Sequence, residues 1–209
     1  AQMSHQREIS EFVQRLKKLL SYNLGKEGRQ TTLRMELEIV KEYIALQQMR
    51  YDFIIEMNIE DGSYLDQPTV RMLFQPLVEN AIRYGLGDDE KISIQVFEDV
   101  ARHLAVVTIS DSGKGLNQEE IDEINQPFDY DWGYWKNENR GIGLRYVKAM
   151  LESFYDGQTS LFVNSKKGFG TRITILLPVR KPEEKKEKDK EVTLEENKVG
   201  QTDESIDCR

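Results

Sequence analysis

Hydrophobic residues occupy every second position in several short segments of this chain, and this alternation sets narrow limits on the fold. Alternation of this kind is the signature of strands with one buried face, and it predicts strands at 53–59, 91–98, 104–110, 158–164 and 170–177. A strand with one buried face needs a second layer to cover it. The chain must therefore also supply helices with hydrophobic faces.

Segments with helical spacing of hydrophobic residues supply that second layer. They predict helices at 8–24, 33–50, 69–85, 117–125 and 141–155. Because helices and strands are mixed without strict alternation, we expect an α/β (α+β) fold rather than a parallel doubly wound sheet. The specific expectation is a two-layer sandwich, in which helices cover one face of a mixed β-sheet and further helices precede it.

The last segment of the chain is too polar to belong to either layer. Residues 181–209 contain 7 Lys/Arg and 10 Asp/Glu but no Phe, Trp or Tyr. Such a composition offers little surface to bury against the entropy cost of ordering. We expect a disordered charged tail, with a docking peptide around Val192 and Leu194 as the alternative.

Charge and cysteine content exclude several classes of protein. The formal net charge of −8 argues against a nucleic-acid partner, which requires clustered Lys and Arg. No apolar run approaches the ~18 residues typical of a membrane span. The single cysteine, Cys208, cannot form an internal disulfide, and with only His5 and His103 beside it no metal-finger spacing exists.

Asn80 is the first polar residue that a purely structural helix would not need. It lies within 75–85, at the edge of the hydrophobic stripe, although asparagine is a poor mid-helix residue. Its amide oxygen is a hard ligand of the kind that Mg²⁺ accepts, with phosphate oxygens and waters completing the shell. The alternative is an asparagine that bonds a neighbouring loop.

Asp111 stands where the strand at 104–110 ends. A carboxylate in an apolar slot can accept a hydrogen bond from the exocyclic amine of adenine. Gly113 and Gly115 follow, and each leaves room for a ligand to approach the backbone closely. Taken alone, Asp-Ser-Gly is also an ordinary turn.

A third segment, Asn139-Arg140-Gly141-Ile142-Gly143-Leu144, places glycines at the start of a helix. The free N–H groups of a helix N-terminus can bind a phosphate, aided by the helix dipole. The chain lacks both Gly-x₄-Gly-Lys-Ser/Thr and a Gly-x-Gly-x-x-Gly after a strand. The two commoner phosphate loops are thereby excluded.

The order of the three segments resembles the N, G1 and G2 boxes of the histidine-kinase and gyrase-type (GHKL) ATPase superfamily. The sequence is most similar to the LytS/YesM-type sensor kinases, whose Gln-Pro-Leu-Val-Glu-Asn-Ala motif is intact at 75–81. The helix at 33–50 also resembles the segment that precedes this motif in that family. The resemblance covers roughly residues 8–178 and implies a Bergerat-type ATP-binding fold.

The resemblance implies a role for each matching position. Asn80 would coordinate Mg²⁺, and Asp111 would bind the adenine amine of ATP. Thr171, in Gly168-Phe169-Gly170-Thr171, would close the base pocket, while Glu79 would position the γ-phosphate or act as a base. The remaining nucleotide-binding positions would be Arg83, Tyr84, Gly113, Gly115, Gly141, Ile142, Gly143 and Leu144.

The resemblance also implies a division of the chain and a set of partners. Residues 1–50 would be the trailing part of a dimerisation and phosphoacceptor region, 51–180 the ATP-binding catalytic domain, and 181–209 the tail. No Pro-His-Phe-type acceptor motif exists, so the γ-phosphate would pass to a histidine outside this chain, and the fragment alone would be nearly inactive. The parent would be a homodimer that phosphorylates a response regulator, with this domain in the cytoplasm and the parent anchored in the membrane.

Two positions depart from the pattern of the family. Pro76 replaces the acidic or amide residue found in many relatives, which argues against the gyrase- or chaperone-type ATPase alternative. Asn139 stands where the phosphate-binding box often has a glycine. The aromatic segment 126–135 occupies the place of the family's mobile lid, where it would stack on adenine, dock a partner helix or pack on itself. A degenerate kinase that binds nucleotide without transferring phosphate is the other alternative.

Overall fold

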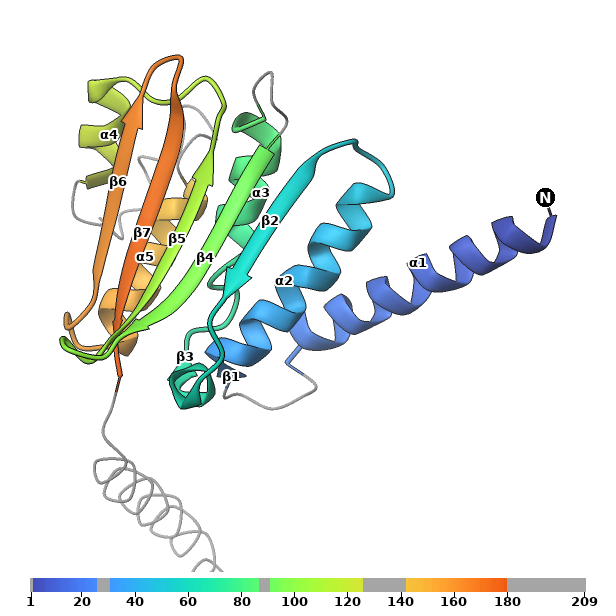
Figure 1. Cartoon of the computed structure of the whole chain (residues 1–209), viewed down its shortest axis with the longest axis horizontal. Helices are drawn as coiled ribbons and strands as arrows, with labels where there is room; N and C mark the ends of the chain where they lie inside the picture. Colours follow the sequence, from blue (N-terminus) through green and yellow to red (C-terminus); the bar gives the residue numbers. More distant parts are fainter. Residues whose placement is uncertain (1, 26–30, 87–90, 126–141, 180–209) are drawn as a thin grey trace, which may run out of the picture. The chain divides into compact units, whose positions relative to one another are not determined.

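A computed structural model describes residues 2–25, 31–86, 91–125 and 142–179. Within these residues a five-stranded mixed sheet has the strand order β2-β4-β5-β7-β6 (Figure 1). β2 runs parallel to β4, and the other neighbouring pairs are antiparallel. The strands are β2 (Ile54–Ile59), β4 (Lys91–Asp99), β5 (Leu104–Asp111), β6 (Ser160–Lys166) and β7 (Gly170–Pro178).

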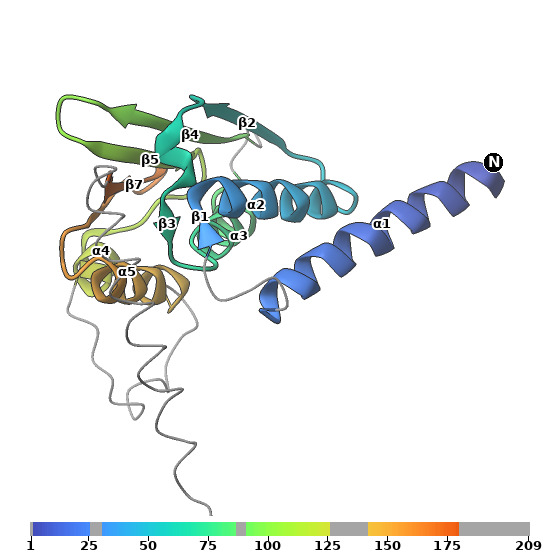
Figure 2. The ribbon, with the colours of Figure 1, turned by 90° about the horizontal axis from the view of Figure 1, so that it is seen from below.

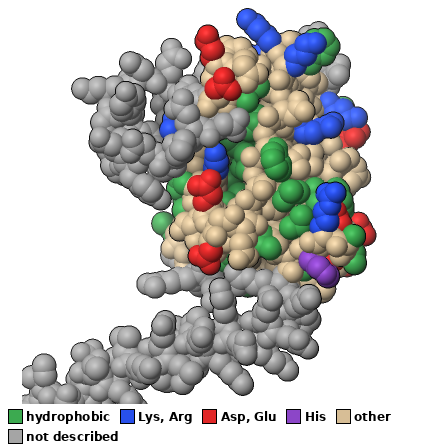
Figure 3. Space-filling model, turned by 90° about the vertical axis from the view of Figure 1, so that its left-hand side faces the viewer, with side chains coloured by type: hydrophobic (Ala, Val, Ile, Leu, Met, Phe, Trp, Pro, Cys, Tyr) green, Lys and Arg blue, Asp and Glu red, His purple; other side chains and the backbone are tan. Residues whose placement is uncertain are grey.

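Helices cover one face of this sheet, as Figure 2 shows with the sheet seen nearly edge-on. The covering helices are α2 (Leu33–Gln48), α3 (Gln75–Tyr84), α4 (Gln118–Asn125) and α5 (Ile142–Phe154). The predicted two-layer mixed sandwich is therefore confirmed. Seen from the side of α4 and β6, hydrophobic side chains gather near the middle of the surface between acidic and basic ones (Figure 3).

The core lies between the two layers. The inward positions of the central strands are all but inaccessible to solvent: Ile92, Ile94, Val96, Val107, Ile109 and Ile175. The helices oppose them with Leu77, Val78, Val147 and Leu151. Each such side chain stabilises the fold by roughly 1.5–3 kcal/mol relative to an exposed one. On β2 the exposed and half-buried positions alternate from Ile54 to Ile59, as the sequence pattern predicts.

The predicted start of the helix at 69–85 is wrong. The helix α3 starts only at Gln75, and the preceding residues form the short strand β3 (Pro68–Thr69) and a turn. β3 pairs with β1 (Thr31–Thr32), which the sequence did not predict. Met72 in the turn has a positive φ of 58°, which a helix cannot accommodate. The hydrophobic residues of this turn, Val70, Leu73 and Phe74, are buried all the same.

The first helix, α1 (Gln2–Asn23), begins earlier than the predicted residue 8. It packs on α2 through a small cluster formed by Leu19, Tyr22, Ile39 and Leu46. Other hydrophobic residues of α1 stay exposed, among them Ile9 at 58% and Val13 at 55%. In the part of the chain that is described, no helix has the length and hydrophobicity needed to cross a membrane. The aromatic segment 126–135 and the tail 181–209 lie outside the described residues, and the division at residue 50 stays a prediction.

Candidate functional site

Asn80 and Asp111 line the same cavity, which lies between α3 and the sheet. The cavity has a volume of about 740 Å³, including the part that opens to solvent. Its wall is formed mostly by hydrophobic side chains, with a few polar groups at separate points. The lining residues are Leu77, Asn80, Ala81, Tyr84, Gly85, Ile109, Asp111, Lys114, Gly115, Leu116, Glu120, Ile124, Leu144, Thr171 and Ile173.

Asp111 is the last residue of β5 and pairs with Thr171 on the neighbouring strand β7. Its Oδ1 accepts hydrogen bonds from the backbone N–H of Gly113 and of Thr171, each at 3.1 Å. Within the described residues Oδ2 accepts no hydrogen bond from the protein. Burial raises the pKa of the Asp111 carboxyl, while the two N–H donors lower it. The carboxylate thus has one anchored oxygen and one oxygen available to a ligand.

Close backbone packing around Asp111 explains the glycines of this segment. A Cβ on Gly113 would lie 2.4 Å from the Cα of Gly85, and one on Gly85 would lie 2.4 Å from the Asp111 Cγ. At Gly115, which has a φ of +64°, a Cβ would lie 2.1 Å from the Lys166 carbonyl oxygen. These glycines allow the end of α3, the loop after β5 and the β6–β7 turn to meet at one point.

The hydroxyl of Thr171 is oriented by Ser165. Ser165 Oγ donates to the Gly170 carbonyl at 2.8 Å and accepts from the Leu116 N–H at 2.8 Å. It also lies 2.9 Å from Thr171 Oγ1. Because the single Ser165 proton is used on Gly170, the Thr171 hydroxyl must donate to Ser165. Thr171 Oγ1 can therefore offer only an acceptor to a ligand in the cavity.

Asn80 comes from the middle of α3, where its side chain is half-buried. The side chain of Asn80 makes no hydrogen bond to a described residue. No described loop therefore supplies the partner that the alternative interpretation, an asparagine bonded to a neighbouring loop, requires. The start of α5 lies beside it: a Cβ on Gly143 would be 3.3 Å from Pro76 Cβ and 3.5 Å from Asn80 Nδ2. Gly143 thus lets the two helices approach closely next to the amide.

Two residues of the next turn of α3 occupy different environments. Tyr84 lines the cavity, with the Lys114 ammonium 5.4 Å from its ring centroid. Arg83 instead forms an ion pair of 2.8 Å with Glu79, and their side chains are 60% and 42% exposed. Neither Arg83 nor Glu79 is among the lining residues. Their roles near the phosphate stay predictions.

The cavity brings together most, but not all, of the residues proposed from sequence. The residues that line it are Asn80, Tyr84, Asp111, Gly115, Leu144 and Thr171. Gly113 donates its backbone N–H to Asp111. Gly141 and the side chain of Ile142 lie outside what the structure describes. The sequence reading missed Gly85, Lys114 and Ser165. Lys114 and Gly85 adjoin motif residues, whereas Ser165 has no local signal because its partners lie on β7 and in the loop after β5.

Two sequence families match the chain. The family described as histidine kinase-, DNA gyrase B-, and HSP90-like ATPase matches residues 65–181, and a family described as histidine kinase matches residues 1–54. The first match includes every residue that lines the cavity.

Individual relatives agree with these families. The sensor protein kinase HptS of Staphylococcus aureus is 30% identical over 168 residues, in strain bovine RF122 / ET3-1 and in strain USA300. That alignment covers 80% of this chain and 32% of the relative, so the chain spans about a third of these proteins. Among solved structures, a histidine kinase domain from Erythrobacter litoralis EL346 aligns with a TM-score of 0.49 at 18% identity, covering 81% of this chain and 74% of that one. The Acinetobacter baumannii histidine kinase AdeS aligns at 0.48 and 17% identity, covering 86% and 82%.

Proposed function

The chain belongs to the histidine kinase-, DNA gyrase B- and HSP90-like ATPase family, and from this premise we propose that it is the ATP-binding catalytic part of a sensor histidine kinase. In this proposal ATP binds in the cavity between α3 and the sheet. Its γ-phosphate is presented to a histidine outside this chain. The observation that carries the proposal is the placement of Asn80 and Asp111 on one cavity.

The cavity suits an adenine base in shape and chemistry. Leu77, Ile109 and Ile173 provide hydrophobic walls for a flat ring system. Oδ2 of Asp111 accepts a hydrogen bond from the exocyclic amine, since Oδ1 already holds two backbone N–H groups. The acceptor oxygen of Thr171 provides a second polar contact at the same end. A carboxylate here discriminates against guanine, which presents a carbonyl oxygen where adenine presents the amine.

The phosphates would lie toward Asn80 and the start of α5. The Asn80 amide oxygen is a suitable hard ligand for Mg²⁺, and among the described residues no group donates a hydrogen bond to it. Bound Mg²⁺ would neutralise part of the phosphate charge. The Lys114 ammonium, which also lines the cavity, adds a positive charge from the protein.

Phosphoryl transfer requires little covalent chemistry from the protein. An imidazole nitrogen of the acceptor forms a bond to the γ-phosphorus, the bond to the bridging β–γ oxygen breaks, and ADP leaves with the electron pair. Such reactions depend on positioning and charge neutralisation. A chain without the acceptor histidine therefore binds nucleotide and transfers phosphate slowly or not at all. Neither His5 nor His103 stands in a Pro-His-Phe-type sequence motif, and His103 is exposed.

We further propose that the parent protein is a membrane-anchored homodimer that pairs through its N-terminal helices and passes phosphate to a response regulator. The 30% identity to the sensor protein kinase HptS and the match of residues 1–54 to the histidine kinase family support the homodimer and the response regulator. The membrane anchor is proposed only from the resemblance of the motif at 75–81 to the LytS/YesM-type sensor kinases. The exposed hydrophobic residues on α1 are consistent with a partner helix.

The test combines binding with transfer. Titration calorimetry with a non-hydrolysable ATP analogue and Mg²⁺ should detect one site per chain, with GTP analogues binding more weakly. Radiolabelled ATP is then added with a histidine-bearing helix from a full-length relative, and label should appear on that histidine. Binding without label on the acceptor would favour a nucleotide-binding regulator instead. Absence of analogue binding would overturn the proposal.

A further inference from the structure

A buried carboxylate lies outside the cavity and contacts the segment from which the Asn80 helix starts. Glu36, in the first turn of α2, is only 2% exposed. Its Oε1 accepts a hydrogen bond from the Met72 N–H at 3.0 Å, and its Oε2 accepts one from the Leu73 N–H at 2.7 Å. The Tyr22 hydroxyl also donates to Oε1. A charged side chain so fully buried must be compensated by such donors.

The turn that Glu36 holds leads directly into the nucleotide-binding helix. Residues 70–74 lie between β3 and α3. Met72 adopts a φ of 58°, a conformation that is unfavourable for residues other than glycine. Phe74, the residue before the helix, provides no side-chain cap. The carboxylate of Glu36 therefore binds the N–H groups just before the helix and compensates for the strained turn. Six residues after Phe74, the same helix carries Asn80.

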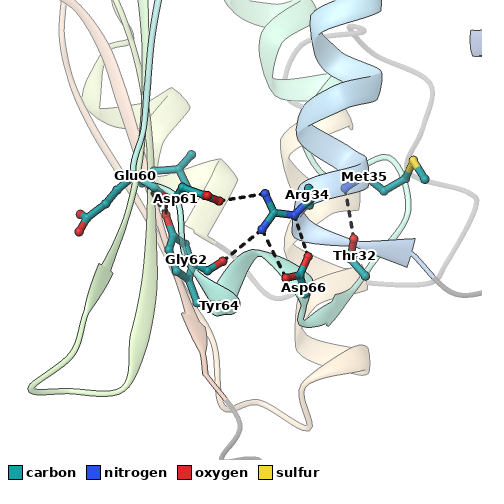
Figure 4. A network of polar contacts seen from close by, with 9 residues as sticks. Thr32, Arg34, Met35, Glu60, Asp61, Gly62, Tyr64 and Asp66 are labelled. Atoms are coloured by element: carbon teal, nitrogen blue, oxygen red, sulfur yellow. Dashed lines mark hydrogen bonds and ion pairs between the residues drawn. The ribbon is translucent and has the colours of Figure 1, made fainter.

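The first turn of α2, in which Glu36 lies, makes further contacts of its own. Thr32 Oγ1 caps the helix by accepting from the Met35 N–H at 3.2 Å. Arg34 donates to Asp66 Oδ1 at 2.7 Å and to Asp61 Oδ1 at 3.0 Å, as Figure 4 shows. These contacts join α2 to the 3₁₀ helix η1 (Ser63–Asp66) and its preceding loop.

Tyr22, one residue before the end of α1, belongs to the same buried group. It is 1% exposed, and its hydroxyl lies 2.8 Å from Thr31 Oγ1 as well as contacting Glu36. Arg71, in the turn, donates to the Tyr22 carbonyl at 3.0 Å, and its guanidinium carbon lies 4.4 Å from the centroid of the Tyr22 ring. The last turn of α1 is thus bonded to both Glu36 and the turn before α3.

We propose that Glu36 is a positioning residue for the phosphate half of the site. It fixes the turn at 70–74, and thereby fixes where α3 presents Asn80. Through Tyr22 the last turn of α1 is part of the same unit, so a displacement of α1 reaches the metal-binding amide without involving Asp111. This inference rests on the proposed function, because it assumes that Asn80 contacts a Mg-nucleotide.

The test uses Glu36→Gln in the full chain. Glutamine has nearly the same shape but only one acceptor oxygen, so an N–H of Met72 or Leu73 must face an NH₂ group. The Kd of a Mg-bound ATP analogue should rise about tenfold, which corresponds to about 1.4 kcal/mol, because the turn before α3 loses one of the bonds that hold it in place. The Kd of adenosine in the absence of metal, measured by NMR titration, should change less than about twofold, because the contacts of Asp111 are not altered. Glu38→Gln, on the exposed side of the same helix, is the matched control and should leave both constants unchanged.

The outcomes separate this inference from the proposed function. If the unaltered chain fails to bind the Mg-analogue, the proposed function is wrong. If it binds and Glu36→Gln behaves like the unaltered chain, or loses both ligands equally with a lower Tm, then Glu36 has no positioning role.

Hydrogen exchange tests the same unit even if Glu36→Gln does not fold. In the unaltered chain, the Mg-analogue should slow exchange of the Met72 and Leu73 amides, while the Arg102 amide in the β4–β5 turn serves as reference. It should also slow the Tyr22 amide in α1. Tyr22→Phe removes the hydroxyl bond to Glu36 but keeps the bond from Arg71 to the carbonyl of residue 22, so the slowing at residue 22 should become smaller while Met72 stays protected. Unchanged exchange at Met72 and Leu73 would refute the role of Glu36. Undiminished slowing at residue 22 in Tyr22→Phe would refute the link from Glu36 to α1.

Discussion

Replacement of Asp111 by asparagine should separate nucleotide binding from stability. In the structure, Oδ1 of Asp111 accepts the N–H groups of Gly113 and Thr171, each at 3.1 Å. The asparagine oxygen must take this place to keep both bonds, since its NH₂ group cannot accept them. The NH₂ group is thereby directed to the position of Oδ2. A donor then faces the amine donor of adenine.

The magnitude follows from the lost contact. A hydrogen bond to a charged acceptor contributes about 1.5–3 kcal/mol, and two donors facing each other add a desolvation cost of about 1 kcal/mol or more. Taking about 3 kcal/mol as the sum, the Kd of an ATP analogue should rise about a hundredfold. Titration calorimetry of both proteins at matched Mg²⁺ gives this ratio directly.

The same substitution should not reduce the stability of the nucleotide-free chain. Burial raises the pKa of Asp111 above its ordinary value of 3.8, so folding stabilises the protonated form relative to the ionised form. The contribution of Asp111 to stability is therefore greatest below that ordinary value and is lost as pH rises through the folded pKa. Asparagine does not titrate. The free energy of unfolding of Asp111→Asn, minus that of the unaltered chain, should increase between about pH 4 and pH 7.

Denaturant unfolding at several pH values measures this difference, and circular dichroism confirms the fold. An Asp111→Asn protein that folds and binds the analogue as tightly as the unaltered chain would refute the assignment of Asp111 to the base. A difference in stability that decreases with rising pH would refute the claim that burial dominates at this carboxyl.

Three further substitutions, one of them with a control substitution, test separate contacts. Gly170→Ala, at a φ of 89° and with a Cβ only 2.0 Å from the Asp111 carbonyl oxygen, should destabilise the chain by at least about 2 kcal/mol in thermal unfolding. Gly157→Ala, at a φ of 74° with nothing within 4 Å, is its control and should cost only about 1 kcal/mol. Tyr155→Phe removes hydroxyl bonds of 3.0 and 3.2 Å to β3 and should lower the free energy of unfolding by about 1 kcal/mol. Asn80→Ala should abolish the dependence of analogue affinity on Mg²⁺ while leaving adenosine binding unchanged, as calorimetry with and without the metal would show.

The sheet could be predicted from sequence because its signals are local. Alternation in 91–98 and 104–110 predicted strands there, and the structure confirms them as β4 and β5. Asp111 was recognisable because it follows the last alternating residue of its strand. Asn80 was recognisable for a similar reason, because its position at the edge of a hydrophobic stripe depends only on neighbouring residues of the same helix.

The start of α3 was missed because its determinant is distant in sequence. Val70, Leu73 and Phe74 are hydrophobic and buried, as in a helix, but a hydrophobic pattern reports burial and not backbone conformation. The backbone is set by Glu36, which lies 36 and 37 residues before the amides that it binds. The N-cap of α2 is Thr32, and Glu36 binds the turn before a different helix.

The two ends of the cavity are held by different kinds of interaction: backbone hydrogen bonds at the base end and side-chain hydrogen bonds at the phosphate end. Asp111 and Thr171 face each other in the β5–β7 ladder, so the base end is fixed by backbone hydrogen bonds that continue along both strands. Asn80 is on a helix whose preceding turn depends on one carboxylate shared with α1. Losing one side-chain bond therefore changes the phosphate end far more than the base end. Displacement of α1 should accordingly alter the presentation of the γ-phosphate while adenine stays bound.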